Sequence, residues 1–89
     1  MREPSKLITK NLFVQTRIIN NKIYAVLHND VYLIDEVGYE IWKTIDGSKN
    51  QDEIITAISS IYQMESSDIK NDVESFISSM INAKLIEQY

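Results

Sequence analysis

The 89-residue sequence contains no cysteine, one histidine, one proline and two glycines. Without cysteine, disulfide scaffolds, zinc ribbons and thiol nucleophiles are excluded, and a reducing cytoplasm is the expected compartment. His28 alone cannot supply the usual ligand sets of structural zinc. Gly38 and Gly47 are too isolated to form a phosphate-cradling glycine loop. We therefore expect no metal site, no cofactor and no enzymatic activity.

The sequence also has no long apolar run and no signal-peptide pattern, so we expect no membrane partner. Hydrophobic residues make up 44% of the chain and charged residues 25%, which is typical of a folded protein. The length allows one small domain. We assign residues 1–10 to a flexible amino-terminal arm and residues 11–89 to that domain.

The net charge of −4 is unevenly distributed. Residues 1–22 carry five basic side chains and one acidic side chain, a net of +4, so residues 23–89 sum to −8. An acidic body repels phosphate backbones, whose neutralisation supplies most non-specific nucleic-acid affinity. We therefore expect no nucleic-acid partner.

The first half of the chain reads as strands. Residues 12–19, 22–27 and 31–34 are rich in β-branched and aromatic side chains. The asparagine pair at 20–21 and the polar residues 28–30 are turn signals between these runs. The pattern predicts a three-stranded antiparallel meander.

The second half has helical periodicity. Asp35 can cap a first helix that ends at Asp46-Gly47. Within this helix Gly38 costs about 1 kcal/mol relative to alanine, and we expect it to permit the close approach of a neighbouring element. Its apolar positions are Val37, Ile41, Trp42 and Ile45.

Two further helices follow. Asn50 and Glu53 form a variant capping box before the apolar positions Ile54, Ile55, Ile58, Ile61 and Tyr62. Ser66 or Ser67 can cap the third helix, whose apolar stripe is Ile69, Val73, Phe76, Ile77, Met80 and Ile81. Because a three-stranded sheet is marginal without a helical layer, we predict an α+β, winged-helix-like domain: a three-stranded antiparallel sheet followed by three helices.

Candidates for chemistry have simpler structural explanations. His28 lies in a predicted turn without a catalytic partner, although a metal or pH-sensitive contact is the alternative. The adjacent carboxylates Asp35 and Glu36 fit helix capping better than acid–base catalysis. Trp42 lies at helical spacing from Ile45, which indicates a core position rather than a ligand-stacking one.

The third strand is more informative. Val31 and Leu33 face one side of it, and Tyr32 and Ile34 face the other. No proline or lysine between residues 30 and 36 protects the strand if it forms a sheet edge, so its unpaired main chain could dock another strand. The alternative is that the strand is paired on both sides or covered by the third helix.

A series of short motifs extends from this strand to the end of the chain: Tyr32-Leu33-Ile34-Asp35-Glu36-Val37-Gly38, Ile41-Trp42, Ile45-Asp46-Gly47, Glu53-Ile54, Ile61-Tyr62, Asp72-Val73 and Phe76-Ile77. Their order and spacing resemble the PqqD-like family, also called recognition elements of ribosomally synthesised and post-translationally modified peptides. The resemblance covers residues 31–86. The family usually has asparagine at position 35 and often glycine at position 83 or 84, so this chain departs from the family pattern at these positions, which bear on subfamily and pathway rather than on the fold.

The resemblance implies a non-catalytic domain that binds the leader segment of a precursor peptide. In the family the leader adds as a strand beside the third strand and packs against the third helix. The partners implied are the leader and a maturation enzyme, either a radical SAM enzyme or a lasso-type leader peptidase. The expected peptide-binding residues are Asp30, Val31, Tyr32, Leu33, Ile34, Asp68, Ile69, Asp72, Val73, Phe76 and Met80.

Roles follow for some of these residues. We expect Ile69, Val73 and Phe76 to meet leader side chains, while Ile77 and Ile81 stay inside the domain. The carboxylates Asp30, Asp68 and Asp72 are expected to select a basic residue in the leader.

Two alternatives remain open. A winged-helix DNA-binding module would read DNA with the third helix, whose first half carries three carboxylates and one lysine. A self-associating adaptor would pair its exposed strand with a second copy as a homodimer.

Overall fold

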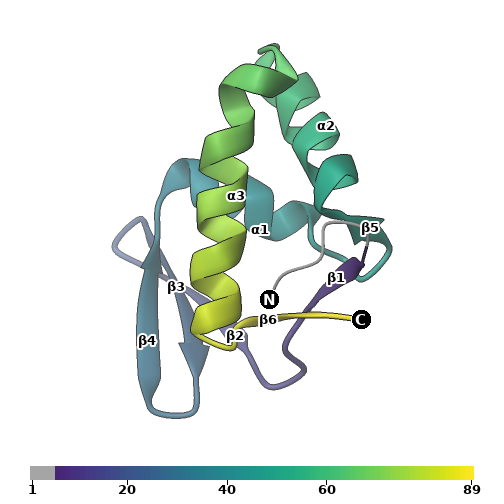
Figure 1. Ribbon diagram of the computed structural model, residues 1–89. Coiled ribbons are helices and arrows are strands. Elements are labelled where there is room, and N and C mark those ends of the chain that lie inside the picture. Colours follow the sequence, from purple (N-terminus) through teal and green to yellow (C-terminus); the bar gives the residue numbers. More distant parts are fainter. Residues whose placement is uncertain (1–5) are drawn as a thin grey trace.

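The computed structural model describes residues 6–89 (Figure 1). The elements follow the order β1 (Leu7–Lys10), β2 (Gln15–Ile19), β3 (Lys22–Leu27), β4 (Asp30–Ile34), α1 (Glu36–Thr44), β5 (Lys49–Asn50), α2 (Gln51–Tyr62), α3 (Ser66–Asn82) and β6 (Ile86–Gln88). The α+β class and the three helices are as predicted, although the two-residue strand β5 lies between α1 and α2.

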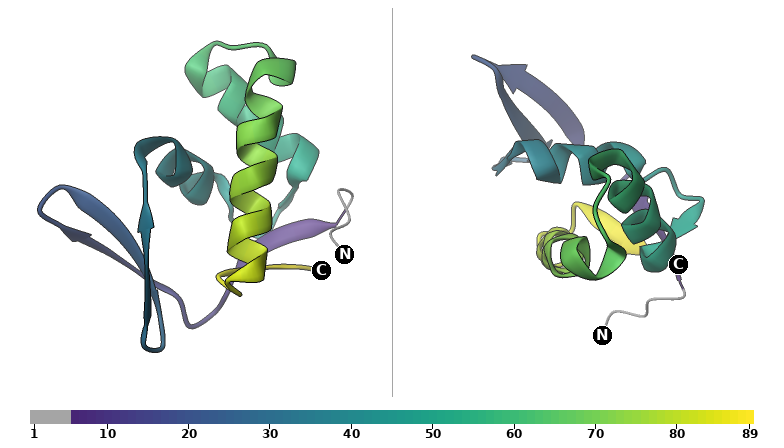
Figure 2. Two further views of the ribbon diagram at one scale, coloured as in Figure 1. Left: turned by 60° about the vertical axis from the view of Figure 1, so that its left-hand side comes forward. Right: turned by 90° about the horizontal axis from the view of Figure 1, so that it is seen from above.

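Strands β2, β3 and β4 form the expected antiparallel meander. Two-residue turns join them, and Asn20, Asn21 and His28 adopt the left-handed backbone conformation that such turns require. The first of these strands is shorter than predicted, because residues 12–14 belong to the preceding turn and β2 begins at Gln15. Figure 2 shows this sheet standing to one side of the helices, as a wing does.

A second three-stranded sheet, ordered β5-β1-β6, was not predicted. Its central strand β1 occupies residues that we assigned to a flexible arm, and that assignment is wrong for residues 7–10. Ile8 is fully buried there, and β1 pairs antiparallel with both β5 and β6. Residues 1–5 of the arm lie outside the described residues.

Local capping signals set the beginnings of two helices. The Asp35 carboxylate accepts a hydrogen bond of 2.7 Å from the Gly38 amide, and Asn50 with Glu53 forms the complete capping box. The third helix differs from the prediction: Glu65 occupies the N-cap position without a side-chain bond, so neither Ser66 nor Ser67 is the cap. The first helix ends at Thr44, before the predicted Asp46-Gly47 stop.

The core lies between the helices and the two sheets. Trp42 is 2% exposed and belongs to this core, as predicted. Its Nε1 donates a hydrogen bond of 3.2 Å to Thr16 Oγ1 on β2, and Lys10 Nζ lies 5.0 Å from its ring centre. Trp42 therefore ties α1 to both sheets. Other fully buried side chains are Ile8, Ile41, Ile45, Ile54, Ile58, Val73, Ile77, Leu85 and Ile86.

Candidate functional site

Strand β4 is an edge strand within residues 6–89, because it pairs with β3 and with no other described strand. In the left view of Figure 2, the β2–β3 hairpin lies on one side of β4 and α3 on the other. The predicted sheet edge is therefore present and faces toward α3.

The register identifies which main-chain groups are free at this edge. Leu27 and Asp30 flank a two-residue turn, so they form a hydrogen-bonded pair. Because hydrogen-bonded and non-hydrogen-bonded pairs alternate along an antiparallel ladder, the next residues of β4 that bond to β3 are Tyr32 and Ile34. Val31 and Leu33 consequently direct their N–H and C=O groups away from β3. These two residues are the main-chain sites at which a further strand can pair.

The side chains of β4 alternate as predicted. Val31 and Leu33 are 60% and 61% exposed, whereas Ile34 is 3% exposed and Tyr32 is half-buried. Val31 and Leu33 therefore lie on the open face of the wing, and Tyr32 and Ile34 lie on the face that packs against the domain.

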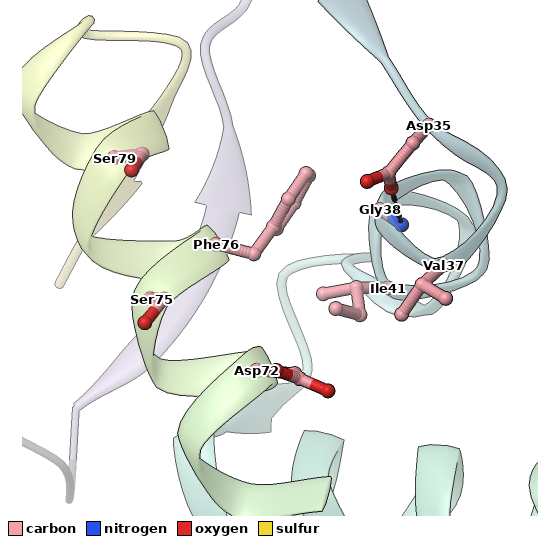
Figure 3. Close-up of a pocket in the computed structure, with 8 residues that line it drawn as sticks. All are labelled: Asp35, Val37, Gly38, Ile41, Asp72, Ser75, Phe76 and Ser79. Atoms are coloured by element: carbon pink, nitrogen blue, oxygen red, sulfur yellow. Dashed lines mark hydrogen bonds between the residues drawn. The ribbon is translucent and has the colours of Figure 1, made fainter.

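A cavity of about 370 Å³ opens beyond the end of β4, between α1 and α3 (Figure 3). Figure 3 shows Phe76 and Asp72 projecting from α3 toward α1, with the Val37 and Ile41 side chains of α1 facing them. The lining residues are Asp35, Val37, Gly38, Ile41, Asp72, Ser75, Phe76 and Ser79. The α1–α3 pocket is the name we use for this cavity.

Phe76 is the aromatic wall of the α1–α3 pocket. It is half-buried and packs on the edge of the core. Its ring lies so close to α1 that a Cβ atom on Gly38 would be 2.8 Å from Phe76 Cε1. The expected role of Gly38, the close approach of a neighbouring element, is thus confirmed, and that element is α3.

The other apolar residues of α3 that were predicted to bind the leader are in the core. Ile69, Val73 and Met80 are buried, with Val73 at 0% exposure. They are buried because α3 packs against α2 as well as α1, and their contact with a leader stays a prediction. The two neighbours cover most of its apolar stripe and leave Phe76 at the margin. Ile81, expected inside, is half-buried beside the core.

The three predicted carboxylates do not share one site. Asp72 lines the α1–α3 pocket, whereas Asp68 is exposed one turn earlier on α3 and is not a lining residue. Asp30 is at the opposite end of β4 from the pocket, beside the turn that begins the strand. The carboxylate that does accompany Asp72 is Asp35, which we had interpreted only as a helix cap.

Sequence reasoning did not identify six of the lining residues as a site: Asp35, Val37, Gly38, Ile41, Ser75 and Ser79. Gly38 within the first helix was the one local signal, since it marks where α3 approaches α1.

The remaining candidates have structural roles. His28 lies in the β3–β4 turn, with its ring centre 6.4 Å from that of Phe13. Glu36 is exposed in the first turn of α1, where the helix dipole favours an acid. Among residues 6–89, no three His, Cys, Asp or Glu side chains are grouped as metal ligands would be. No helix in the same range combines the length and apolar character needed to cross a bilayer.

Comparison with known proteins agrees with this architecture. The sequence profile of the family described as coenzyme PQQ synthesis protein D (PqqD) matches residues 23–86. The chain belongs to this family. Among curated proteins none is similar enough to count as a relative.

Two solved structures share the fold. The structure of TbiB1 in complex with the TbiA(β) leader peptide is 23% identical, has a TM-score of 0.75, and aligns over 91% of this chain and 96% of that chain. The solution structure of the PqqD part of Methylobacterium extorquens PqqCD is 16% identical, has a TM-score of 0.78, and aligns over 96% and 93%. The latter represents a functional, stand-alone recognition element for ribosomally synthesised and post-translationally modified peptides.

Proposed function

We propose that this protein captures the leader segment of a ribosomally synthesised precursor peptide as an additional strand on β4, and presents it to a maturation enzyme. The observation that carries the proposal is the free edge of β4, which ends directly at the α1–α3 pocket. A peptide paired along this edge gains main-chain hydrogen bonds, while the pocket takes a side chain and provides selectivity.

Family membership and the neighbouring structures support this function. TbiB1 shares the fold and was solved with a leader peptide, and the Methylobacterium extorquens domain acts as a stand-alone recognition element. We propose a binding role without catalysis, exercised in the cytoplasm. The chemistry would be supplied by the partner, a radical SAM enzyme or a lasso-type leader peptidase.

The two alternative functions use the same elements differently. DNA reading by α3 is disfavoured because Asp68, Asp72 and Glu74 outnumber the single Lys70 on its first half, and a duplex repels such a helix. Self-pairing through β4 would occupy the edge that the leader needs. We therefore expect leader addition to compete with any homodimer that forms there.

An NMR titration tests the proposal. The isotope-labelled full chain is titrated with the leader of the precursor peptide encoded beside its gene. We expect saturable shifts in residues 30–35 and 72–79, with few shifts in β5, β1 and β6. An intact spectrum that does not respond would overturn leader capture. Sedimentation and a salt-dependent mobility shift on duplex DNA would then test the two alternatives.

A further inference from the structure

The chemistry of the α1–α3 pocket is uneven. Val37, Ile41 and Phe76 form an apolar part of its lining. Both of its charged residues, Asp35 and Asp72, are acidic. No lysine or arginine is among the lining residues. The pocket therefore combines an apolar surface with negative charge at its margin.

The two carboxylates are not equivalent. Asp35 is the N-cap of α1, and its Oδ1 accepts the Gly38 N–H at 2.7 Å, so the amino end of the helix compensates its charge. The Asp72 carboxylate is exposed on α3, and within residues 6–89 it has no hydrogen-bond or ion-pair partner. The negative charge available to a ligand is mainly that of Asp72.

Strand geometry determines what can enter the pocket. Side chains of a strand added to β4 alternate between the open face, beside Val31 and Leu33, and the inner face, beside Tyr32 and Ile34. After Ile34 the chain turns into α1, whose first turn forms one wall of the pocket. A side chain of the added strand that lies on the inner face, next to the end of β4 at Ile34, therefore points between α1 and α3.

We infer that the α1–α3 pocket selects a lysine or arginine side chain of the bound leader, an inference that rests on the proposed function. The aliphatic stem of such a side chain packs on Phe76 and Val37, which are only partly buried, and its charged end extends to the Asp72 carboxylate. A glutamate or aspartate at the same position is repelled by the Asp72 carboxylate. An apolar side chain fills the apolar walls and gains nothing from Asp72.

A selection experiment with a defined probe tests this inference. A library of random twelve-residue peptides displayed on phage is selected on the immobilised full chain. The affinity of an enriched synthetic peptide is then measured for the wild type, Asp72→Asn and Glu87→Gln. Glu87 is the matched charge control, because it is exposed on β6 and lies outside the pocket lining.

We expect the enriched peptides to share one lysine or arginine at a fixed spacing from apolar residues. Asp72→Asn should weaken binding of such a peptide by about three- to fivefold, the upper part of the range for exposed ion pairs. The difference should shrink in high salt, and Glu87→Gln should bind as the wild type does. Circular dichroism verifies that both variants are folded.

Two other outcomes separate the claims. The selectivity for a basic residue is overturned if the enriched peptides shift the β4 resonances but share no lysine or arginine. It is also overturned if Asp72→Asn weakens their binding no more than Glu87→Gln does. Either result leaves leader capture intact. If no enriched peptide shifts β4, strand capture itself is overturned, and this inference is overturned with it.

Discussion

The ring of Phe76 on α3 lies directly against the backbone of Gly38 on α1. A Cβ atom at position 38 would lie 2.8 Å from Phe76 Cε1 and 3.0 Å from the capping oxygen of Asp35. Glycine in a helix interior costs about 1 kcal/mol relative to alanine. At this position it permits the contact that forms the aromatic wall of the α1–α3 pocket.

The first prediction concerns Gly38→Ala. The added methyl group displaces the Phe76 ring, and such overpacking costs about 1–3 kcal/mol, which the better helix propensity of alanine partly offsets. We expect a loss in unfolding free energy of about 0–2 kcal/mol in urea denaturation, with a clear loss of leader affinity because the displaced ring intrudes on the pocket.

The matched control for Gly38→Ala is the double variant Gly38→Ala/Phe76→Leu. Leucine is shorter than phenylalanine, so the alanine methyl group at position 38 should overlap less with the side chain at position 76. The double-mutant cycle should therefore show coupling between the two positions. Strict additivity would contradict direct packing between Gly38 and Phe76.

The second prediction ranks two residues of α3. Phe76→Ala removes the half-buried aromatic side chain that lines the α1–α3 pocket, whereas Asp68→Ala removes an exposed charge outside the pocket lining. Anchors in pockets dominate binding energy and rim charges contribute little. We expect a larger loss of leader affinity for Phe76→Ala in calorimetry, with circular dichroism verifying the fold. Equal losses would contradict this ranking.

The fold was predictable where its signals are local. The asparagine turn at 20–21, the Asp35 cap and the Asn50–Glu53 capping box lie next to the elements that they define. The β5-β1-β6 sheet has no such signal. Its strands are two to four residues long, and Ile8 pairs with Lys49 and Gln88, far away in the sequence.

The site was predictable in part for a similar reason. Alternation along Val31–Ile34 gave the two faces of the edge strand correctly. Periodicity also gave the apolar stripe of α3, but the sequence could not tell which part of that stripe α2 would cover. Val73 and Phe76 are both apolar positions of this stripe, and tertiary packing alone buries the first and leaves the second half open.

The third prediction concerns pH. Hydrogen bonds from the Ser48 hydroxyl and amide to Asp46, together with Lys49 Nζ at 3.0 Å, hold the pKa of the Asp46 carboxyl well below its ordinary value. The folded state therefore favours the charged carboxylate. Its stabilising contribution is present above the unfolded pKa of about 3.9 and is lost as the pH falls toward the folded pKa.

Ser48→Ala removes the hydroxyl donor and should raise the pKa of Asp46 toward its ordinary value, as measured by a carboxyl carbon NMR titration. Lys49→Gln is the comparison variant, and it should also raise the pKa of Asp46, because the Lys49 ammonium donates a hydrogen bond to this carboxylate and attracts its negative charge. A Ser48→Ala protein whose Asp46 titrates as in the wild type would contradict this account of the turn.

The last prediction tests strand addition through the main chain of β4. Leu33 directs its N–H away from β3, so Leu33→Pro removes a donor at the free edge without removing a bond of the β3–β4 ladder. Leu33→Ala is the matched control, because it removes the side chain and keeps the N–H. Relative to Leu33→Ala, we expect Leu33→Pro to bind the leader about three- to tenfold more weakly, the value of one net hydrogen bond.

Tyr32→Pro should instead lower the thermal midpoint sharply, because Tyr32 pairs with Ala25. Equal affinities of the proline and alanine variants at position 33 would show that the leader does not pair with this edge.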